Sequence, residues 1–243
     1  MQVELMAHTQ LSEKYFNTFK DVSESATTDG QVVSLGAIRQ CYSYKTTKEV
    51  LETEYEKYFG EKGKEGKRLF DFIVKSKHVS TFEHMHFSFA VEGVSRALLA
   101  QLTRHRHLSF SVQSQRYNKF SSDSRSGGFD YVTPKTISII NEKIEGINHC
   151  EGALGIYEEA MAHCQYAYNM LIKAGVPQED ARSVLPNAAT CNLVTSGNLR
   201  AWLEFYKKRK KGNGAQAEIA EFAEHIKNAI IEVEPWCKEY FEL

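Results

Sequence analysis

Apolar and polar residues alternate in two segments of the chain, and this period of two predicts extended strands with one face in the core. Between Leu108 and Gln113 every second residue is apolar. Residues 84–92 alternate in the same way, and residues 3–7 form a third predicted strand at the start of the chain. Each of these segments would present one face to the interior and a polar face to solvent.

Helical spacing of apolar residues marks most of the rest of the chain. A segment rich in alanine and leucine follows Ser95, whose hydroxyl is suited to cap the first turn, and its end delivers Arg104. Aromatic and alanine-rich faces in residues 137–174 predict core or subunit-interface helices. The helices predicted in this way cover residues 35–44, 69–74, 95–103, 137–174, 177–185, 195–211 and 215–231.

Length and composition narrow the class of protein. The 243 residues suffice for a buried core in one large domain or two small ones. A formal net charge of -1 gives no general reason to expect nucleic acid as a partner. No apolar run approaches the ~18–20 residues of a membrane span, and the first residues lack the basic and apolar regions of a signal peptide. We therefore expect a cytoplasmic protein without a membrane partner.

The sequence gives no convincing metal site. The pairs His149-Cys150 and His163-Cys164 lie in a predicted helix, where fourteen residues separate them by ~21 Å, too far to share an ion. His84 and His86 would share one strand face, but no third ligand accompanies them. The five cysteines contain no Cys-x-x-Cys pair, so neither a zinc knuckle nor a disulfide framework is indicated.

Residues 104–117 carry the most distinctive chemistry of the chain. This segment contains three arginines, two histidines and three serines, but no aspartate or glutamate to neutralise them. Arginine binds phosphate through two parallel hydrogen bonds and stays charged at physiological pH. The segment therefore predicts an anion site. The alternative is a solvated loop whose cations pair with some of the 31 acidic residues elsewhere in the chain.

The spacing within this segment resembles the signature of the flavin-dependent thymidylate synthases. Arg104-His105-Arg106 is followed, after seven residues, by Ser114-Gln115-Arg116-Tyr117. Further segments resemble the family in the same order along the chain. They are His78-Val79-Ser80-Thr81-Phe82-Glu83-His84, Ala181-Arg182-Ser183-Val184-Leu185-Pro186 and Thr195-Ser196-Gly197-Asn198-Leu199-Arg200-Ala201-Trp202.

The resemblance implies a mixed α/β (α+β) fold, in which helices flank a twisted and largely antiparallel sheet. It implies a single domain over residues 1–243 and a homotetramer with active sites between subunits. The implied activity is the reductive methylation of dUMP to dTMP, a step of nucleotide biosynthesis. FAD would be the cofactor, NADPH the reductant and methylenetetrahydrofolate the carbon donor. No Gly-x-Gly-x-x-Gly is present, so FAD would not be bound by a Rossmann motif.

The resemblance also assigns site residues. The catalytic residues would be Arg104, Ser114 and Arg116, with Ser114 as a hydrogen-bond donor, because no Gly-x-Ser-x-Gly elbow surrounds it. The dUMP site would comprise Gln101, Arg104, Ser114, Gln115 and Arg116. The FAD site would comprise His78, Ser80, Glu83, Arg104, His105, Arg106, His107, Arg209 and Asn213. His78 would also lie where the folate approaches, although its residue type and position alone suggest a helix C-terminal cap.

Three positions depart from the commonest family pattern. Asn192 and Ala220 stand where many members carry an arginine that helps to hold dUMP, and Val112 stands where many carry glutamate or glutamine. Each lost charge-assisted hydrogen bond is worth about 1.5–3 kcal/mol, so other groups would have to replace them. Arg96, Arg125 and Lys210 are the candidates.

Two other functions remain open. The departures are compatible with a related flavin enzyme that modifies a different uracil nucleotide. The basic run Lys207-Lys208-Arg209-Lys210-Lys211 could instead belong to a non-catalytic nucleic-acid-binding module, although a solvated helix end is the more common origin of such a run. The neutral charge balance argues against the nucleic-acid module.

Overall fold

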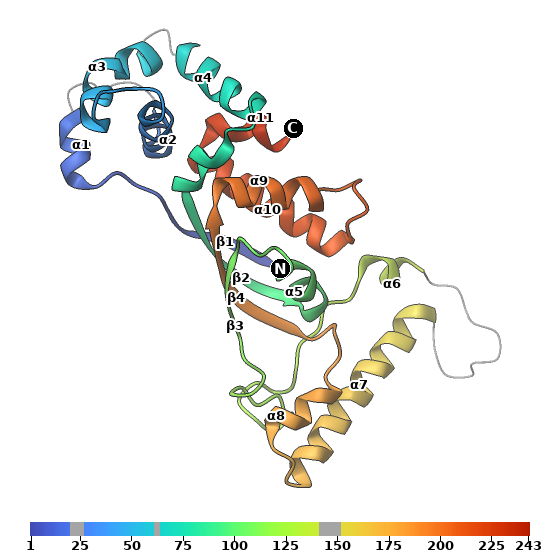
Figure 1. Ribbon diagram of the computed structural model, residues 1–243. Helices are drawn as coiled ribbons and strands as arrows, with labels where there is room; N and C mark the ends of the chain where they lie inside the picture. The colour runs from blue at the N-terminus through green and yellow to red at the C-terminus, as the bar shows by residue number, and fades with distance from the viewer. Residues whose placement is uncertain (20–26, 61–63, 141–151) are drawn as a thin grey trace. The chain divides into compact units, whose positions relative to one another are not determined.

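A four-stranded antiparallel sheet runs through the computed structural model (Figure 1), which describes residues 1–19, 27–60, 64–140 and 152–243. Its strands are β1 (Gln2–His8), β2 (His86–Ser95), β3 (Ser109–Val112) and β4 (Thr190–Asn198). They pair in the order β1-β2-β4-β3, so the last strand in sequence lies between the second and the third. The predicted strands at residues 3–7, 84–92 and 108–113 all correspond to strands of this sheet, and the predicted fold class is confirmed.

Helices make up most of the remaining structure. They are α1 (Glu13–Phe19), α2 (Asp29–Gln40), α3 (Thr47–Phe59), α4 (Lys64–Lys75), α5 (Arg96–Leu102), α6 (Lys135–Ile139), α7 (Gly152–Lys173), α8 (Gln178–Ala181), α9 (Leu199–Arg209), α10 (Ala217–Val233) and α11 (Lys238–Phe241). The described residues also form three 3-10 turns, η1 (Val79–His84), η2 (Arg182–Val184) and η3 (Pro235–Cys237). No helix among the described residues is long and apolar enough to cross a membrane.

Two sequence predictions are wrong in detail. His84 ends η1 and His86 begins β2, so the two histidines do not share a strand face. The predicted helix at residues 195–211 starts too early, because Thr195–Asn198 form the end of β4. The side chain of Asn198 accepts a hydrogen bond of 2.8 Å from the amide of Ala201 and thereby caps α9.

Strand β4 was missed because its buried face is built from small and polar residues. Cys191, Leu193, Thr195 and Gly197 are buried, while the residues between them are more exposed. Gly197 lies so close to Leu108 that an added Cβ would come within 2.4 Å of its side chain. The strand therefore shows the alternation of buried and exposed residues that is expected of a sheet. Its composition is not apolar enough to predict a strand from the sequence.

The chain divides into two compact units. The first comprises residues 1–2, 91–104 and 110–194, and the second comprises residues 3–90, 105–109 and 195–243. The family's single domain over residues 1–243 stays a prediction.

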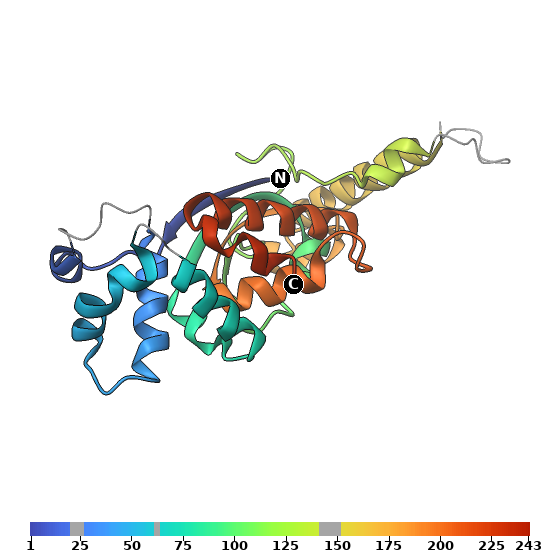
Figure 2. The same ribbon diagram turned by 90° about the horizontal axis from the view of Figure 1, so that it is seen from above.

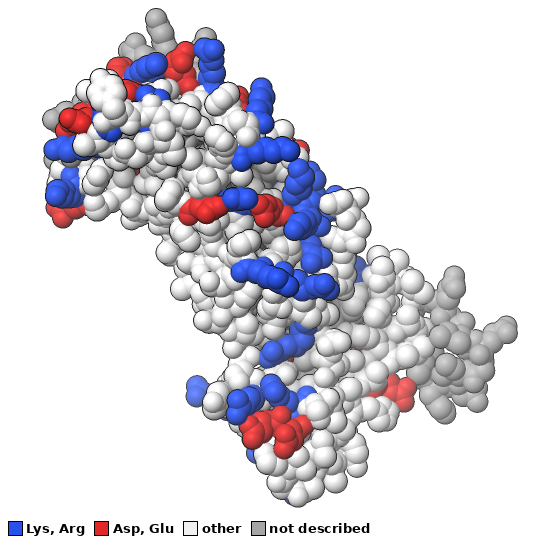
Figure 3. Space-filling view, in the orientation of Figure 1, with Lys and Arg blue, Asp and Glu red and all other residues white. Residues whose placement is uncertain are grey.

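Aromatic side chains fill the core of the second unit. The ring of Trp202 on α9 meets those of Phe89 and Phe205 edge to face, with centroids 5.2 and 5.7 Å apart. Phe205 in turn meets Phe222, which ties α9 to α10. Figures 1 and 2 show these two helices side by side next to the sheet. On the face shown in Figure 3, acidic and basic side chains both occur over the helices of this unit.

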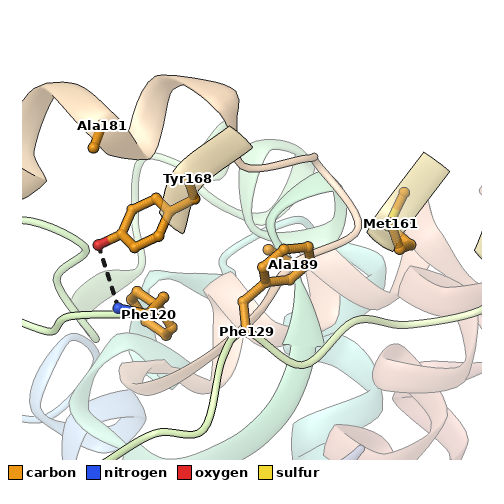
Figure 4. Packing of buried hydrophobic residues seen from close by; sticks show 6 residues of the cluster. All are labelled: Phe120, Phe129, Met161, Tyr168, Ala181 and Ala189. Carbon is orange, nitrogen blue, oxygen red and sulfur yellow. Dashed lines mark hydrogen bonds between the residues drawn. The ribbon is translucent and has the colours of Figure 1, made fainter. Parts of the chain in front are cut away.

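The first unit has its own smaller core (Figure 4). Buried residues from the segment after β3, from α7 and from the approach to β4 make up this cluster, namely Phe120, Phe129, Met161, Tyr168, Ala181 and Ala189. The fully buried Tyr168 hydroxyl accepts a hydrogen bond of 3.3 Å from the amide of Phe120. This contact fixes the path of the chain after the signature segment, residues 104–117.

Candidate functional site

The two compact units divide the predicted nucleotide and flavin contacts between them. The first unit contains Gln101, Arg104, Ser114, Gln115 and Arg116. The second contains His78, Ser80, Glu83, His105, Arg106, His107, Arg209 and Asn213. The signature segment contributes residues to both units, and Arg104, predicted to contact both ligands, ends a segment of the first.

The signature segment begins at the end of α5, as predicted. The hydroxyl of Ser95 caps the helix by accepting a hydrogen bond from the amide of Leu98, and Arg104 follows its last turn. Arg104, Arg106 and His107 are exposed. Among the residues that the structure describes, no carboxylate lies within ion-pair distance of Arg104 or Arg106. Both guanidinium groups can therefore accept an anionic ligand.

Arg116 has an internal ion-pair partner. Its Nη2 lies 3.0 Å and its Nε 3.1 Å from Oε2 of Glu179 on α8, and both side chains are about half exposed. The amide of Arg116 donates a hydrogen bond of 3.1 Å to the hydroxyl of Ser114. The carbonyl oxygen of Arg116 accepts a further bond from the side chain of Gln178. Residues 114–116 are thus held as a turn, with Glu179 occupying the position of an anion.

Of the two other predicted nucleotide contacts, Gln101 donates a hydrogen bond of 3.4 Å from its side chain to the carbonyl oxygen of Ala97. Gln115 is half-buried. These contacts do not connect Gln101 or Gln115 with a ligand-binding cavity. The roles of both residues in binding dUMP therefore stay predictions.

The three departures from the family pattern differ in their surroundings. Asn192 accepts a hydrogen bond of 3.0 Å on Oδ1 from the amide of Gly93, so its side chain is engaged with the sheet. Val112 is half-buried in β3, and Ala220 is buried in α10. Of the replacement cations, Arg96 donates a bond of 2.7 Å to the carbonyl oxygen of Gln113, beside the signature turn.

The other two replacement candidates lie elsewhere. Arg125 is exposed in the loop after β3, and the ammonium group of Lys210 lies 5.9 Å from the centre of the Tyr206 ring. Arg96 is therefore the candidate that directly contacts the segment predicted to bind the nucleotide.

His105 and Arg209, which are 104 residues apart, meet in the second unit. Nε of Arg209 donates a hydrogen bond of 3.1 Å to Nε2 of His105, and the imidazole packs edge to face against Phe205. Burial and, to a smaller extent, the nearby charges of Arg209 and Lys208 together lower the pKa of His105 to about 4. His105 is therefore neutral near pH 7 and orients the guanidinium group of Arg209.

A small polar cavity lies around Arg200, which the sequence did not single out as a ligand contact. Its guanidinium group lies 2.6 Å from Glu83 and 3.1 Å from Glu204, and these bonds raise the pKa of Arg200. The cavity measures about 190 Å³ and is lined by Glu83, His107, Asn198, Arg200, Ala201 and Glu204. Two predicted flavin contacts, Glu83 and His107, therefore line one cavity.

His78 occupies the helix-capping position that its sequence context suggests. Its amide donates a bond of 3.0 Å to the carbonyl oxygen of Ile73, while the amide of Lys77 donates to that of Val74. Lys77 has φ +62°, and this pattern is the Schellman motif that ends α4. The imidazole is exposed, and its Nδ1 lies 2.7 Å from the hydroxyl of Tyr42.

The last two predicted flavin contacts are exposed. Ser80 lies in η1, directly after His78 and Val79. Asn213 follows α9 and donates a bond of 2.8 Å from its side-chain amide to the carbonyl oxygen of Lys207. The basic run forms the last turn of α9 and its immediate continuation, where cations complement the helix dipole.

The donor set of the second unit fits part of a flavin dinucleotide. Arginine, imidazole, hydroxyl and amide groups are the donors that bind pyrophosphate and hydrogen-bond the flavin ring. A cavity of about 190 Å³ is, however, smaller than the ~300–1,000 Å³ of sites that enclose a ligand of this size. This cavity by itself is therefore too small to enclose the whole cofactor.

Metal binding and the buried Cys237 thiol are two further aspects of the chemistry of the described residues. No group of three or more histidine, cysteine or acidic residues among them could hold a metal ion. Burial raises the pKa of the Cys237 thiol to about 12, so this cysteine is not activated as a nucleophile. The His149-Cys150 pair lies outside the described residues.

Comparison with a family model matches residues 24–236 to the thymidylate synthase complementing protein family. A flavin-dependent thymidylate synthase of Haloarcula marismortui is 34% identical over 184 residues, which cover 72% of this chain and 73% of the relative. One of Geobacter sulfurreducens is 40% identical over 139 residues. That match covers 57% of this chain and 54% of the relative, so the chain aligns with only about half the length of this protein.

Two solved structures share the fold. A UMP/dUMP methylase, PolB, of Streptomyces cacaoi bound to 5-bromo-dUMP has a TM-score of 0.70 and 22% identity, covering 99% of this chain and 94% of that one. A flavin-dependent thymidylate synthase of Helicobacter pylori in complex with FAD and dUMP has a TM-score of 0.63 and 19% identity. The alignment covers 100% of this chain and 98% of the second structure.

Proposed function

Since this chain belongs to the thymidylate synthase complementing protein family, the flavin-dependent thymidylate synthases, we propose that it methylates dUMP at C5 to give dTMP. The carbon donor is methylenetetrahydrofolate and the reductant is NADPH. One observation carries the proposal: the family match spans every residue assigned to the site, from His78 to Asn213. The solved relative from Helicobacter pylori contains FAD and dUMP.

The nucleotide is assigned to residues of the first unit. Arg104 is exposed without an acidic partner among the described residues, and Arg116 carries a carboxylate that a phosphate group can replace. Both guanidinium groups bind the phosphate of dUMP, while Ser114, Gln115 and Gln101 donate to or accept from its other polar atoms. Ser114 acts by hydrogen bonding, because its hydroxyl is engaged with the amide of Arg116 rather than with a general base.

The cofactor is assigned to residues of the second unit. FAD supplies the redox chemistry when it is bound. Arg106, His107 and Ser80 are exposed for contact with it, and Glu83 holds Arg200 at the polar cavity. Arg209 is oriented by the neutral His105, and Asn213 lies beyond the end of the same helix.

A homotetrameric assembly is part of the proposal. The cavity around Arg200 is by itself too small to enclose FAD, which supports a site that a second copy of the chain completes. A homotetramer with active sites between subunits would provide such a site. The cytoplasmic location of the protein stays a prediction. Sedimentation with and without FAD tests the assembly, and a monomer that binds FAD stoichiometrically would contradict it.

The activity is tested by the conversion of dUMP to dTMP in the presence of methylenetetrahydrofolate, NADPH and FAD. The product is identified by mass spectrometry, and reactions that lack one component each serve as controls. Conversion that depends on all of them supports the proposal. Conversion without added or bound flavin contradicts it.

A second candidate is the methylation of UMP. Its motivation is the set of departures from the commonest family pattern, since Asn192 and Ala220 stand in place of two arginines and Val112 in place of glutamate or glutamine. The fold relative PolB is a UMP/dUMP methylase. The kcat/KM for UMP divided by that for dUMP decides between the two candidate functions. A value above one selects the methylation of UMP.

A further inference from the structure

Glu234 is a buried acidic residue that the site described above does not use. It is 1% exposed and lies where α10 ends. Its amide donates a hydrogen bond of 2.8 Å to the carbonyl oxygen of Ile230, and its carbonyl oxygen accepts one of 3.1 Å from the amide of Cys237. The backbone of Glu234 is thus fixed on both sides, between α10 and η3.

Three donors converge on the two carboxylate oxygens of Glu234. The amide of Gly30 donates a hydrogen bond of 3.2 Å to Oε1, and Nε1 of Trp236 donates one of 2.6 Å to Oε2. The hydroxyl of Thr28 also donates to Oε2, while its oxygen accepts a bond of 3.2 Å from the amide of Gln31. In the described part of the chain, no lysine or arginine pairs with Glu234, so neutral donors hold its charge.

These donors compensate for the burial of the carboxylate. Desolvation raises the pKa of Glu234 above its ordinary value, whereas the hydrogen bonds from Thr28, Trp236 and Gly30 favour the charged form. Since a buried charge without partners is strongly destabilising, Glu234 and its donors hold one another in place.

Two of the three donors belong to the start of α2. Thr28 is the N-cap of this helix and Gly30 lies in its first turn. A Cβ at Gly30 would lie 2.3 Å from Oε1 of Glu234, closer than real Cβ atoms approach a heavy atom, so the contact requires glycine at this position. A negative charge at the N-terminus of a helix is favourable, because the first amides point towards it. Glu234 therefore holds the first turn of α2.

The other end of α2 leads to His78. The helix ends at Gln40 and is followed by Cys41 and Tyr42. The hydroxyl of Tyr42 lies 2.7 Å from Nδ1 of His78. Twelve residues of helix span about 18 Å as one stiff element, so a displacement of the first turn is transmitted to Tyr42. The bond to His78 is sensitive to such a displacement, because hydrogen bonds weaken steeply with poor geometry.

We propose that Glu234 is a positioning residue for His78 and acts through α2 and Tyr42. This inference rests on the proposed function, which assigns His78 to the approach of the folate. The carboxylate fixes the start of α2, and α2 fixes the hydroxyl of Tyr42. That hydroxyl holds the imidazole in the tautomer that carries its hydrogen on Nε2.

The variant Glu234→Gln tests this connection with little change in side-chain size. An amide has one accepting oxygen, so its NH2 group faces at least one of the three donors and displaces α2. The KM for methylenetetrahydrofolate is expected to rise by about three- to tenfold, while kcat and the KM for dUMP change by less than about twofold. The double variant Glu234→Gln/Tyr42→Phe is expected to be no worse than Tyr42→Phe alone, because both changes break the same connection.

Two glycines of α2 provide a matched pair of variants. Gly30→Ala separates the helix from the carboxylate without altering the carboxylate, so it is expected to reproduce the effect of Glu234→Gln. It also tests the same contact if Glu234→Gln fails to fold. Gly36→Ala adds the same methyl group to the same helix, where the Cβ would meet only Thr47 at 3.1 Å and Leu51 at 3.9 Å. Gly36→Ala is expected to leave the KM for the folate unchanged.

The tautomer of His78 is measured independently of turnover. Nitrogen NMR of protein labelled in its histidine rings distinguishes the two tautomers, and the variant His78→Gln assigns the signal. The wild type is expected to carry the hydrogen on Nε2 of His78, and Glu234→Gln is expected to show a mixture of both forms. An enzyme without turnover that shows this change keeps the connection and loses the proposed function.

Three results overturn the inference while normal turnover upholds the proposed function. The first is a His78 signal that is the same in the wild type, Glu234→Gln and Gly30→Ala. The second is a purely additive effect of the Glu234 and Tyr42 changes on the KM for the folate. The third is an equal rise in the KM values for the folate and for dUMP, which would show that Glu234 only stabilises the fold.

Discussion

The hydroxyl of Tyr42 lies 2.7 Å from Nδ1 of His78, although 36 residues separate the two along the chain. Tyr42 follows α2 and His78 follows α4, so the bond links the ends of two helices. With the phenol as donor, Nδ1 accepts the hydrogen bond and Nε2 carries the ring hydrogen. The exposed imidazole is thereby held in one orientation and one tautomer, which suits the proposed role of His78 as a contact to the folate.

Replacing Tyr42 by Phe is expected to raise the KM for methylenetetrahydrofolate by about three- to tenfold, because one hydrogen bond of about 0.5–1.5 kcal/mol is lost. The KM for dUMP is expected to stay unchanged. The matched control is Tyr44→Phe, since Tyr44 is 99% exposed and only two residues away. Steady-state kinetics with either substrate varied separates the two effects, and an equal rise in both KM values would refute the role of Tyr42.

The anion site predicts a large effect from Arg104→Ala and from Arg116→Ala. Each change is expected to weaken nucleotide binding by about 10- to 150-fold, because a charge-assisted bond of about 1.5–3 kcal/mol is lost. Equilibrium binding of dUMP, measured by calorimetry, checks this. Lys119→Gln, an exposed cation three residues beyond Arg116, is the control. Nucleotide binding that survives both arginine changes rules out the site.

Glu179 is expected to compete with the nucleotide phosphate for Arg116, because the two side chains form an ion pair. The change Glu179→Gln removes the competing charge from a half-exposed ion pair worth about 0.2–1 kcal/mol. The expected result is dUMP binding that is tighter by about two- to fivefold, with little change in kcat. Weaker binding would show instead that Glu179 holds Arg116 in its productive position.

Arg200 is predicted to contribute to flavin binding, because it lines a cavity together with Glu83 and His107. The change Arg200→Gln leaves both Glu83 and Glu204 without their cation and is expected to weaken FAD binding by about tenfold or more. Quenching of flavin fluorescence measures the affinity. The same substitution at the exposed Lys207, near the other end of α9, provides the comparison. An unchanged affinity for FAD in the variant Arg200→Gln would show that this cavity is not part of the cofactor site.

His105 makes stability depend on pH. Its pKa is about 4 in the folded protein, against about 6.5 for an ordinary histidine, so between these values the unfolded chain binds more protons. The stabilisation is complete above about pH 6.5 and is lost as the pH falls toward 4. After allowance for the partial exposure of the ring, the loss is about 1 kcal/mol.

Urea unfolding at about pH 7.5 and at about pH 5 measures this dependence. The variant His105→Gln cannot titrate, so its unfolding free energy is expected to fall less between the two pH values than that of the wild type. His163→Gln, at an exposed position on α7, controls for the loss of an imidazole elsewhere. Identical pH dependence in wild type and His105→Gln would contradict the assignment.

Local patterns in the sequence predicted the elements with strong signals. Ser95 before an alanine- and leucine-rich stretch marked α5 correctly, and the alternation after Leu108 marked β3. Strand β4 gave no such signal, because Cys191, Thr195 and Gly197 fill its buried face. The close approach of Leu108 to Gly197 is a tertiary contact that no local pattern contains.

Contacts between distant residues of the candidate site could not be predicted from the sequence either. The resemblance identified His105 and Arg209 separately, but only the fold shows that the first orients the second. Arg200 stood in a recognised segment, yet its pairing with Glu83 joins residues 117 positions apart. The Tyr42–His78 bond also joins two distant helix ends, so sequence alone offered only the helix-capping interpretation of His78. Composition predicted an anion site, while the cofactor came solely from the resemblance.

The proposed function requires that oxidation of the reduced flavin is coupled to methylation of a nucleotide. The most direct measurement is the visible absorption spectrum of the purified protein with FAD, reduced by NADPH under nitrogen and then given dUMP and methylenetetrahydrofolate. We expect a flavin band that bleaches on reduction and returns only when both the nucleotide and the folate are present. A protein that binds no flavin, or a reduced flavin whose oxidation ignores the nucleotide, would contradict it.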